Sequence, residues 1–114
     1  MPVVLAVALG GAVGAAARYG TDQLISTHAT FPWSTFVVNI VGCFFVGWFS
    51  EVFGDSSDWL RSGMIVGLVG GFTTFSTFAY QALENHAALS AVYVSASVGL
   101  GIAAVALGRA IWAG

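Results

Sequence analysis

The sequence predicts an all-α membrane protein with four transmembrane helices, and three observations support this fold class. The chain has 114 residues, of which 58% are hydrophobic and only 7% are charged. A soluble domain carries about 25% charged residues, so this chain could not cover a water-facing surface with polar groups. Its mean hydropathy is +0.90. The apolar residues also gather in four stretches, each with the roughly 20 residues that a helix needs to cross a bilayer.

The four predicted spans form a single domain that covers residues 1–114. The first is not a cleaved signal peptide, because it lacks a basic n-region and contains the polar Arg18. Pro32 suits the start of the second helix. Asp58 is placed to cap the third. The spans extend over about residues 3–25, 33–53, 60–83 and 87–112.

Charge and cysteine content exclude several function classes. The net charge is -2 and the chain has no basic run, so we expect no nucleic-acid partner. Cys43 is the one cysteine, which rules out a disulfide within the chain and falls short of a zinc site. We expect it to fill space in a helix. The sequence also lacks a nucleophile–base pair and a phosphate-binding loop, so an enzyme is not predicted.

Small residues recur in the predicted spans at positions where helices could approach closely. Four helices enclose little more than their own side chains, so a pathway would be built more easily by an oligomer. Small residues allow tight packing of membrane helices, either within one chain or between subunits. We expect some of them to form a subunit interface. They are Gly10, Gly11, Gly14, Gly42, Gly47, Gly99 and Gly101.

The basic residues give almost no orientation signal. The chain has three arginines and no lysine. Arg61 and Arg109 lie toward the side of the termini, and Arg18 lies toward the other side. The positive-inside rule therefore acts on a difference of one arginine. The chain can insert both ways, which permits an antiparallel dimer, although a weak bias could still fix one orientation.

Polar side chains inside the spans are candidate functional residues, because they are costly in hydrocarbon. Arg18 either anchors its helix at the headgroups or attracts anions at the mouth of a vestibule, and Asp22 could pair with it. Asn39 either bonds a neighbouring helix or lines a polar track, and Thr35 shares its face. Tyr93 and Ser97 share a face of the fourth span, where a serine can also bond to its own helix.

The third span contains the unusual segment GGFTTFSTF at residues 70–78. Glycines and β-branched threonines disfavour a helix centre, which predicts a break in the membrane. Broken helices expose backbone groups and are typical of ion sites, where carbonyls suit Na⁺. Phe75 and Phe78 share a face, and the positive edges of their rings could hold an anion. The alternative is ordinary aromatic packing around a glycine kink.

These segments together resemble the Fluc (CrcB) fluoride channels over essentially the whole chain. The first span carries GGAVGAAARY at residues 10–19, and the third carries GLVGGFTTFSTF at residues 67–78. The second and fourth spans carry the matching residues Thr35, Asn39, Gly42, Tyr93 and Ser97.

The resemblance implies a fluoride-selective channel of the cell membrane that exports cytoplasmic fluoride passively and so lowers its toxicity. It implies a dual-topology antiparallel homodimer with two pores. Phe75 and Phe78 would form a phenylalanine box, Asn39 would donate to fluoride, and hydroxyls would form a track. The implied pore residues are Asn39, Phe75, Phe78, Ser76, Thr77, Thr35, Tyr93 and Ser97.

The resemblance also implies a structural Na⁺ at the dimer interface. Backbone carbonyls of Gly70 and Thr73 from both subunits would hold it, and Arg18 would lie near the vestibule. The chain departs from the family just after the motif, where Ala79 and Gln81 replace the usual serine and glutamate. The missing serine shortens the hydroxyl track. The missing glutamate removes a carboxylate that is a candidate gating or coordinating group.

Two other functions and one other assembly are open from the sequence. A small multidrug-type four-helix transporter needs a carboxylate in the membrane, but the acidic residues all lie at span ends or in loops. A non-transporting membrane scaffold would not need the break or Asn39. Some relatives pair as heterodimers of two chains, but retention of Asn39, Phe75 and Phe78 favours a homodimer.

Overall fold

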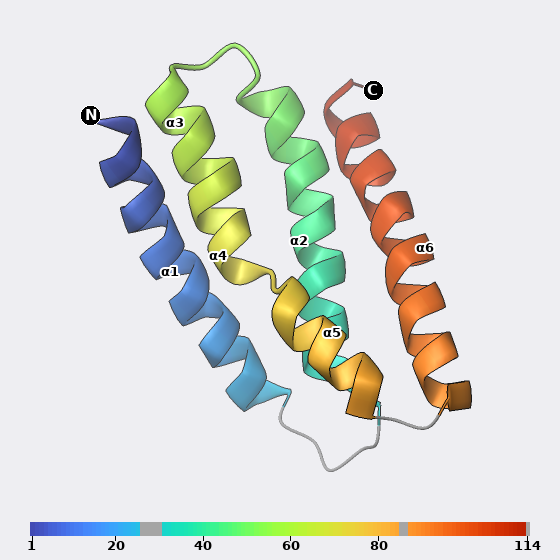
Figure 1. Cartoon of the computed structure of the whole chain (residues 1–114). Coiled ribbons are helices and arrows are strands. Elements are labelled where there is room, and N and C mark those ends of the chain that lie inside the picture. The colour runs from blue at the N-terminus through green and yellow to red at the C-terminus, as the bar shows by residue number, and fades with distance from the viewer. Residues whose placement is uncertain (26–30, 85–86, 114) are drawn as a thin grey trace.

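The protein is a bundle of helices that run between two ends of the molecule, in a computed structural model that describes residues 1–25, 31–84 and 87–113 (Figure 1). Its helices are α1 (Val3–Leu24), α2 (Trp33–Val52), α3 (Asp58–Ser62), the π-helical η1 (Gly63–Val69), α4 (Gly70–Phe72), α5 (Phe75–Glu84) and α6 (Ala87–Ala113). Four segments of the described chain have the length and apolar composition to cross a membrane: Val3–Leu24, Trp33–Val52, Asp58–Glu84 and Ala87–Ile111. The predicted all-α fold with four spans is confirmed.

The start of the third span differs from the prediction. Asp58 was expected to cap this helix, but it is the first helical residue, and Ser57 precedes it without a capping bond from its side chain. The Asp58 carboxylate instead pairs with Arg61 at 2.5 Å. A negative charge in the first turn still suits the positive end of the helix dipole.

The spans pack as two pairs of helices (Figure 1). Helix α1 packs along η1 and α4, and α2 packs along α6. After a break in the third span, α5 leaves α1 and continues against α2 and α6. Both termini and the loop between α2 and α3 lie at one end of the bundle.

Glycines bring α1 and the third span into backbone contact. A Cβ atom added to Gly67 would lie 2.6 Å from the carbonyl oxygen of Val7, and one added to Gly71 would lie 2.6 Å from that of Gly11. Added Cβ atoms on Gly10 and Gly14 would meet the backbone of the third span in the same way. Any side chain at these positions would force the two helices apart.

Packing within one chain therefore accounts for most of the glycines that were expected at a subunit interface. Gly42 contacts Thr73, and Gly47 contacts the backbone of Val105 on α6. Gly101 lies against Cys43, whose Sγ atom is 3.3 Å from an added Cβ. Gly99 faces open space, so an interface role is still open there.

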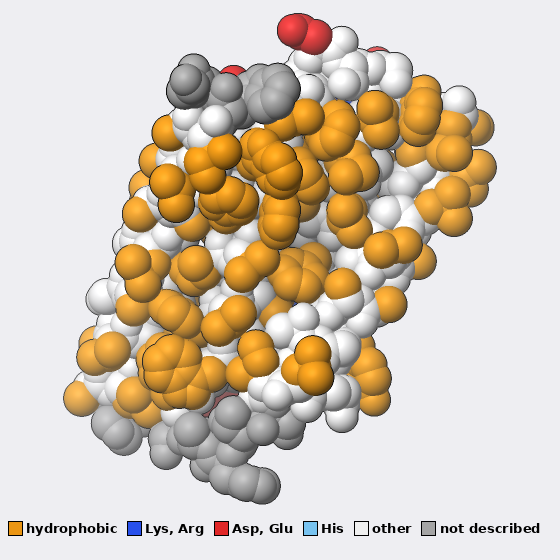
Figure 2. Space-filling view, turned by 180° about the vertical axis from the view of Figure 1, so that it is seen from behind, with side chains coloured by type: hydrophobic (Ala, Val, Ile, Leu, Met, Phe, Trp, Pro, Cys, Tyr) orange, Lys and Arg blue, Asp and Glu red, His pale blue; other side chains and the backbone are white. Residues whose placement is uncertain are grey.

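The outer surface is apolar over the membrane-spanning length. Figure 2 shows hydrophobic side chains across the middle of one face, with the visible acidic side chains at its ends. The interior is thin, and Val38 and Tyr93 are the largest fully buried side chains of the described residues. An apolar exterior suits a lipid solvent, which cannot hydrogen-bond to exposed polar groups. The chain is thus a multi-pass membrane protein.

The charged side chains lie near the ends of the spans. Arg109 pairs with Glu51 at 3.0 Å, which ties the end of α6 to the end of α2. The pair considered between Arg18 and Asp22 is not among the ion pairs of the described residues. Asp22 accepts a hydrogen bond from Ser34 on α2. Arg18 is half-buried, and its Nε atom has no hydrogen-bond partner among the described residues.

Candidate functional site

The break in the third span lies at Thr73 and Thr74, directly after the two glycines of the motif. Thr73 is extended, with φ -85° and ψ 162°. Gly70 and Gly71 are still helical, which corrects the expectation that the glycines would unwind. Gly71 serves the contact with α1 instead, whereas β-branched threonine fits an extended backbone well.

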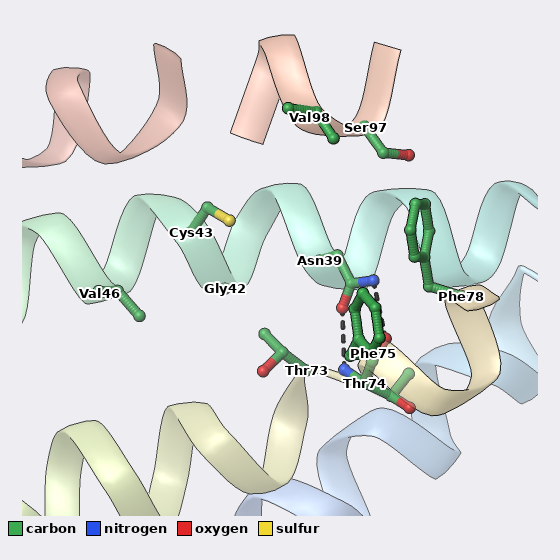
Figure 3. Close-up of a pocket in the computed structure, with 10 residues that line it drawn as sticks. All are labelled: Asn39, Gly42, Cys43, Val46, Thr73, Thr74, Phe75, Phe78, Ser97 and Val98. Carbon is green, nitrogen blue, oxygen red and sulfur yellow. Dashed lines mark hydrogen bonds between the residues drawn. The ribbon is translucent and has the colours of Figure 1, made fainter. Parts of the chain in front are cut away.

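Asn39 on α2 satisfies the backbone at the break through two hydrogen bonds. Its Nδ2 donates to the carbonyl of Thr74 at 3.0 Å, and the N–H of Thr74 donates to its Oδ1 at 2.9 Å (Figure 3). The helix–helix hydrogen bond considered for Asn39 is therefore present. Nδ2 carries a second hydrogen, which is available to a ligand.

Helix α5 begins beside this amide with its own cap. The N–H of Thr77 donates to Oγ1 of Thr74 at 3.3 Å, a side-chain bond typical of a helix N-terminus. The first N–H groups of a helix and its dipole attract negative charge. The start of α5 therefore adds positive potential to the polar groups around Asn39.

The break also releases two backbone carbonyls. In an unbroken helix the N–H of Thr74 would bond to the carbonyl of Gly70, but it bonds to Asn39. Likewise, the N–H of Thr77 bonds to the Thr74 hydroxyl rather than the carbonyl of Thr73. These carbonyls belong to Gly70 and Thr73, the two residues expected to hold Na⁺. Their oxygen atoms are therefore suitable ligands for that cation. Binding itself stays a prediction.

A pocket of about 310 Å³ opens at the break, between α2, α5 and α6 (Figure 3). It combines one amide, several hydroxyls and two aromatic rings with apolar side chains. It is lined by Asn39, Gly42, Cys43, Val46, Thr73, Thr74, Phe75, Phe78, Ser97 and Val98. Four predicted pore residues thus come together: Asn39, Phe75, Phe78 and Ser97.

The two phenylalanines of the motif lie next to each other at this pocket. Their ring centroids are 5.8 Å apart with an interplanar angle of 42°. Phe75 is 78% exposed in the single chain, while Phe78 packs on Tyr93 with a centroid distance of 5.0 Å. The Phe78 ring is therefore supported by Tyr93, whereas the Phe75 ring is largely uncovered.

Ser97 brings a hydroxyl group from α6 to the same pocket. Its Oγ atom is buried, and it has no hydrogen-bond partner in the part of the chain that the structure describes. A buried hydroxyl without a partner is costly, so such a group is suited to a ligand.

The other predicted pore residues lie outside the pocket of the single chain. Thr35 is buried in the bundle, and Ser76 is exposed, 3.4 Å from the Thr74 hydroxyl. Tyr93 is fully buried and donates a long hydrogen bond of 3.4 Å to Oε1 of Gln81. Gln81, one of the two residues that depart from the family pattern, therefore forms a polar link between α5 and α6. The pore roles of Thr35, Ser76, Thr77 and Tyr93 stay predictions.

Thr74 is the main residue that sequence reasoning missed. It bonds Asn39 through its backbone and caps α5 through its side chain. One signal was available, since a threonine three residues before Thr77 can act as a helix cap. Cys43 and Val46 were also missed, although they lie four and seven residues after Asn39 and hence on its face.

Comparisons with known proteins agree with the sequence resemblance. A family model described as CrcB-like protein, Camphor Resistance (CrcB), matches residues 5–109. The chain is 44% identical to the fluoride-specific ion channel FluC of Rhizobium johnstonii, over 92% of this chain and 91% of the relative. It is 42% identical to fluoride-specific ion channel FluC 2 of Rhodococcus jostii, over 92% and 94% of the two chains. It is 38% identical to the fluoride-specific ion channel FluC of Flavobacterium psychrophilum, over 97% of both chains. The chain belongs to the CrcB-like protein family.

Proposed function

We propose that this protein is an ion channel that conducts fluoride passively and selectively out of the cell. The observation that carries the proposal is the pocket at the broken third span. Hydrogen-bond donors, aromatic edges and a helix N-terminus converge there. Relatives over nearly the full length of the chain are named fluoride-specific ion channels.

The pocket suits a small anion that must leave its water. The free hydrogen of the Asn39 amide and the hydroxyl of Ser97 can donate to fluoride, and the edges of the Phe75 and Phe78 rings carry partial positive charge. Strong donors in a narrow path replace the tight hydration shell of fluoride, while the larger chloride is excluded by size.

Export by this route requires no energy source other than the electrochemical gradient. Hydrogen fluoride crosses membranes as a neutral weak acid and dissociates in the cytoplasm. An inside-negative membrane potential then drives the trapped anion out through a selective pore. The channel therefore lowers fluoride toxicity without pumping.

The channel we propose consists of two copies of the chain in antiparallel orientation. The exposed ring of Phe75 and the open side of the pocket support this, because a partner would cover them. Bound Na⁺ would supply a structural charge that holds the two breaks together. The carbonyls of Gly70 and Thr73 would be its ligands.

A proton-coupled four-helix transporter is the second candidate, and the charges argue against it. Such a transporter needs a carboxylate in the middle of the membrane. The acidic residues of this chain lie at or near helix ends or in the loop after α2; they are Asp22, Glu51, Asp55, Asp58 and Glu84. A scaffold without transport gives no reason for the break or its bonded amide.

Growth of fluoride-sensitive cells tests the proposed function. Cells that lack their own fluoride exporter should regain growth in millimolar fluoride when they express this protein. Cells expressing the Asn39→Asp variant at the same level should stay sensitive, because the carboxylate removes a donor and adds a negative charge. Equal sensitivity with and without the wild-type protein would contradict the proposal.

A further inference from the structure

Thr74 is held at three points, although it lies in the two-residue gap between α4 and α5. Its N–H and carbonyl groups bond to the Asn39 side chain at 2.9 and 3.0 Å, and its hydroxyl accepts from Thr77 at 3.3 Å. We propose that Asn39 and Thr74 form a latch that positions the start of α5 and thereby aims Phe75 at the anion path. This positioning role rests on the proposed function of the pocket.

The two bonds of the latch have the pattern of a short β-ladder. A primary amide offers one donor and one acceptor side by side, so it can pair with both groups of a single peptide residue. An amide that acted only as a fluoride donor would not need its oxygen to be engaged. In this structure the amide oxygen of Asn39 accepts a hydrogen bond from the Thr74 N–H. This half of the amide therefore binds the backbone of the third span.

The Asn39 side of the latch lies on a well-packed part of α2. Val38, next to Asn39, is fully buried, and α2 is packed along α6. One turn farther along α2, Gly42 contacts the side chain of Thr73. Helix α2 thus meets both residues of the break, at two neighbouring turns.

The position of the first aromatic ring follows from this arrangement. Phe75 is the residue directly after Thr74 and the first residue of α5. Its ring is 78% exposed in the single chain, so surrounding side chains do little to fix it. Apart from the neighbouring ring of Phe78, whose centroid is 5.8 Å away, the backbone at Thr74 is the main constraint on the ring. Releasing the latch should therefore move Phe75 without removing any group of the pocket.

A pair of substitutions at Thr74 isolates one latch bond. Both Thr74→Pro and Thr74→Ala remove the Thr74 hydroxyl. Only the proline also removes the N–H that donates to Asn39, whereas the alanine keeps it. The extended Thr73, with ψ 162°, is compatible with a following proline. Neither substitution alters the Asn39 side chain, so a purely fluoride-donating amide would be equally active in both variants.

Fluoride efflux from liposomes compares the two variants. We expect the proline variant to be slower than the alanine variant by about tenfold, the scale expected for loss of one well-formed hydrogen bond. Equal rates in two variants that elute like the wild type in size-exclusion chromatography would overturn the latch.

Hydrogen exchange at the Thr74 amide provides a measurement independent of transport. In Asn39→Leu, which has a similar shape but no hydrogen bonds, the Thr74 amide should exchange about tenfold faster than in the wild type. In Ser97→Ala, which alters the same pocket outside the latch, its exchange should be unchanged.

Unchanged exchange in Asn39→Leu would overturn the latch even if the proline variant failed to fold. A wild-type protein that carries no fluoride would reject the proposed function instead. Faster exchange in Asn39→Leu would still support the latch in that case, so the two failures are distinguishable.

Discussion

Phe75 is an aromatic residue whose position makes little sense in an isolated chain. It begins α5, lines the pocket and exposes 78% of its surface. Its neighbour Phe78 is supported by Tyr93 on α6. The edge-on contact with an anion that we propose would give an exposed ring a role beside a bonded amide and a helix N-terminus.

Replacing this ring tests its contact with fluoride. Phe75→Ile keeps an apolar side chain but removes the positive ring edge, so fluoride flux should fall about tenfold while the dimer persists. Flux from liposomes and size-exclusion chromatography measure the two effects. Leu83→Ile, an exposed position on the same helix, should keep the wild-type rate. Wild-type flux in Phe75→Ile would remove this residue from the pore.

At the scale of elements, backbone contacts through glycine hold α1 against the third span. Because Gly67 and Gly71 face carbonyl groups of α1, the helices approach more closely than side chains would permit. This seam fixes the first half of the third span, and the second half is free to turn toward α6. The break at Thr73 and Thr74 separates the two halves.

Adding one methyl group to the seam should destabilise the fold. Gly67→Ala places a Cβ 2.6 Å from the Val7 carbonyl oxygen, and such overpacking costs roughly 1–3 kcal/mol. The midpoint of thermal unfolding in detergent should therefore fall. Gly20→Ala on α1 is the matched control, because an added Cβ there meets nothing within 4 Å. A similar midpoint for both variants would count against the seam.

The elements were largely predictable, because their signal is local. Apolar runs of span length placed all four helices, and the third was expected at about residues 60–83 where the structure has Asp58–Glu84. The composition of residues 70–78 also predicted a break. Its position was less predictable, since Gly71 stays helical for a contact with Gly11 that lies 60 residues away.

The partners of the polar residues were not predictable from one sequence. Asn39 was recognised as a residue that needs hydrogen bonds, but its partner lies 35 residues away across the bundle. Asp22 was considered as a partner for Arg18 one helical turn away, and it accepts a hydrogen bond from Ser34 on α2. Local spacing describes neighbours on one helix, whereas tertiary packing decides which helix supplies the partner.

At the scale of the whole molecule, charge gives little preference for one orientation. Arg61 and Arg109 pair with acidic side chains at 2.5 and 3.0 Å at the end of the bundle that holds the termini. Arg18 lies toward the other end. A difference of one arginine is a weak signal for the insertion machinery.

Dual topology therefore follows as a prediction for the cell. A reporter fused to the C-terminus should be found on both sides of the membrane in comparable amounts. Three lysines added after the C-terminus should shift the population to the orientation with that end in the cytoplasm. A wild-type reporter found on one side alone would exclude an antiparallel homodimer.

Removal of Na⁺ tests the assembly of the two breaks. If the carbonyls of Gly70 and Thr73 hold Na⁺ between two copies, replacing it by a large organic cation should lower both fluoride flux and the fraction of dimer. Both should recover when Na⁺ is returned. Indifference of flux and dimer to the exchange would contradict this site.

Selective anion flux through the purified protein is the central claim, and reconstituted liposomes measure it directly. Vesicles loaded with equal concentrations of fluoride and chloride are diluted into a medium without either anion, and two ion-selective electrodes record their release once the membrane potential is dissipated. We expect rapid, protein-dependent release of fluoride while chloride stays inside. Equal release of the two anions, or no release beyond protein-free vesicles, would contradict it.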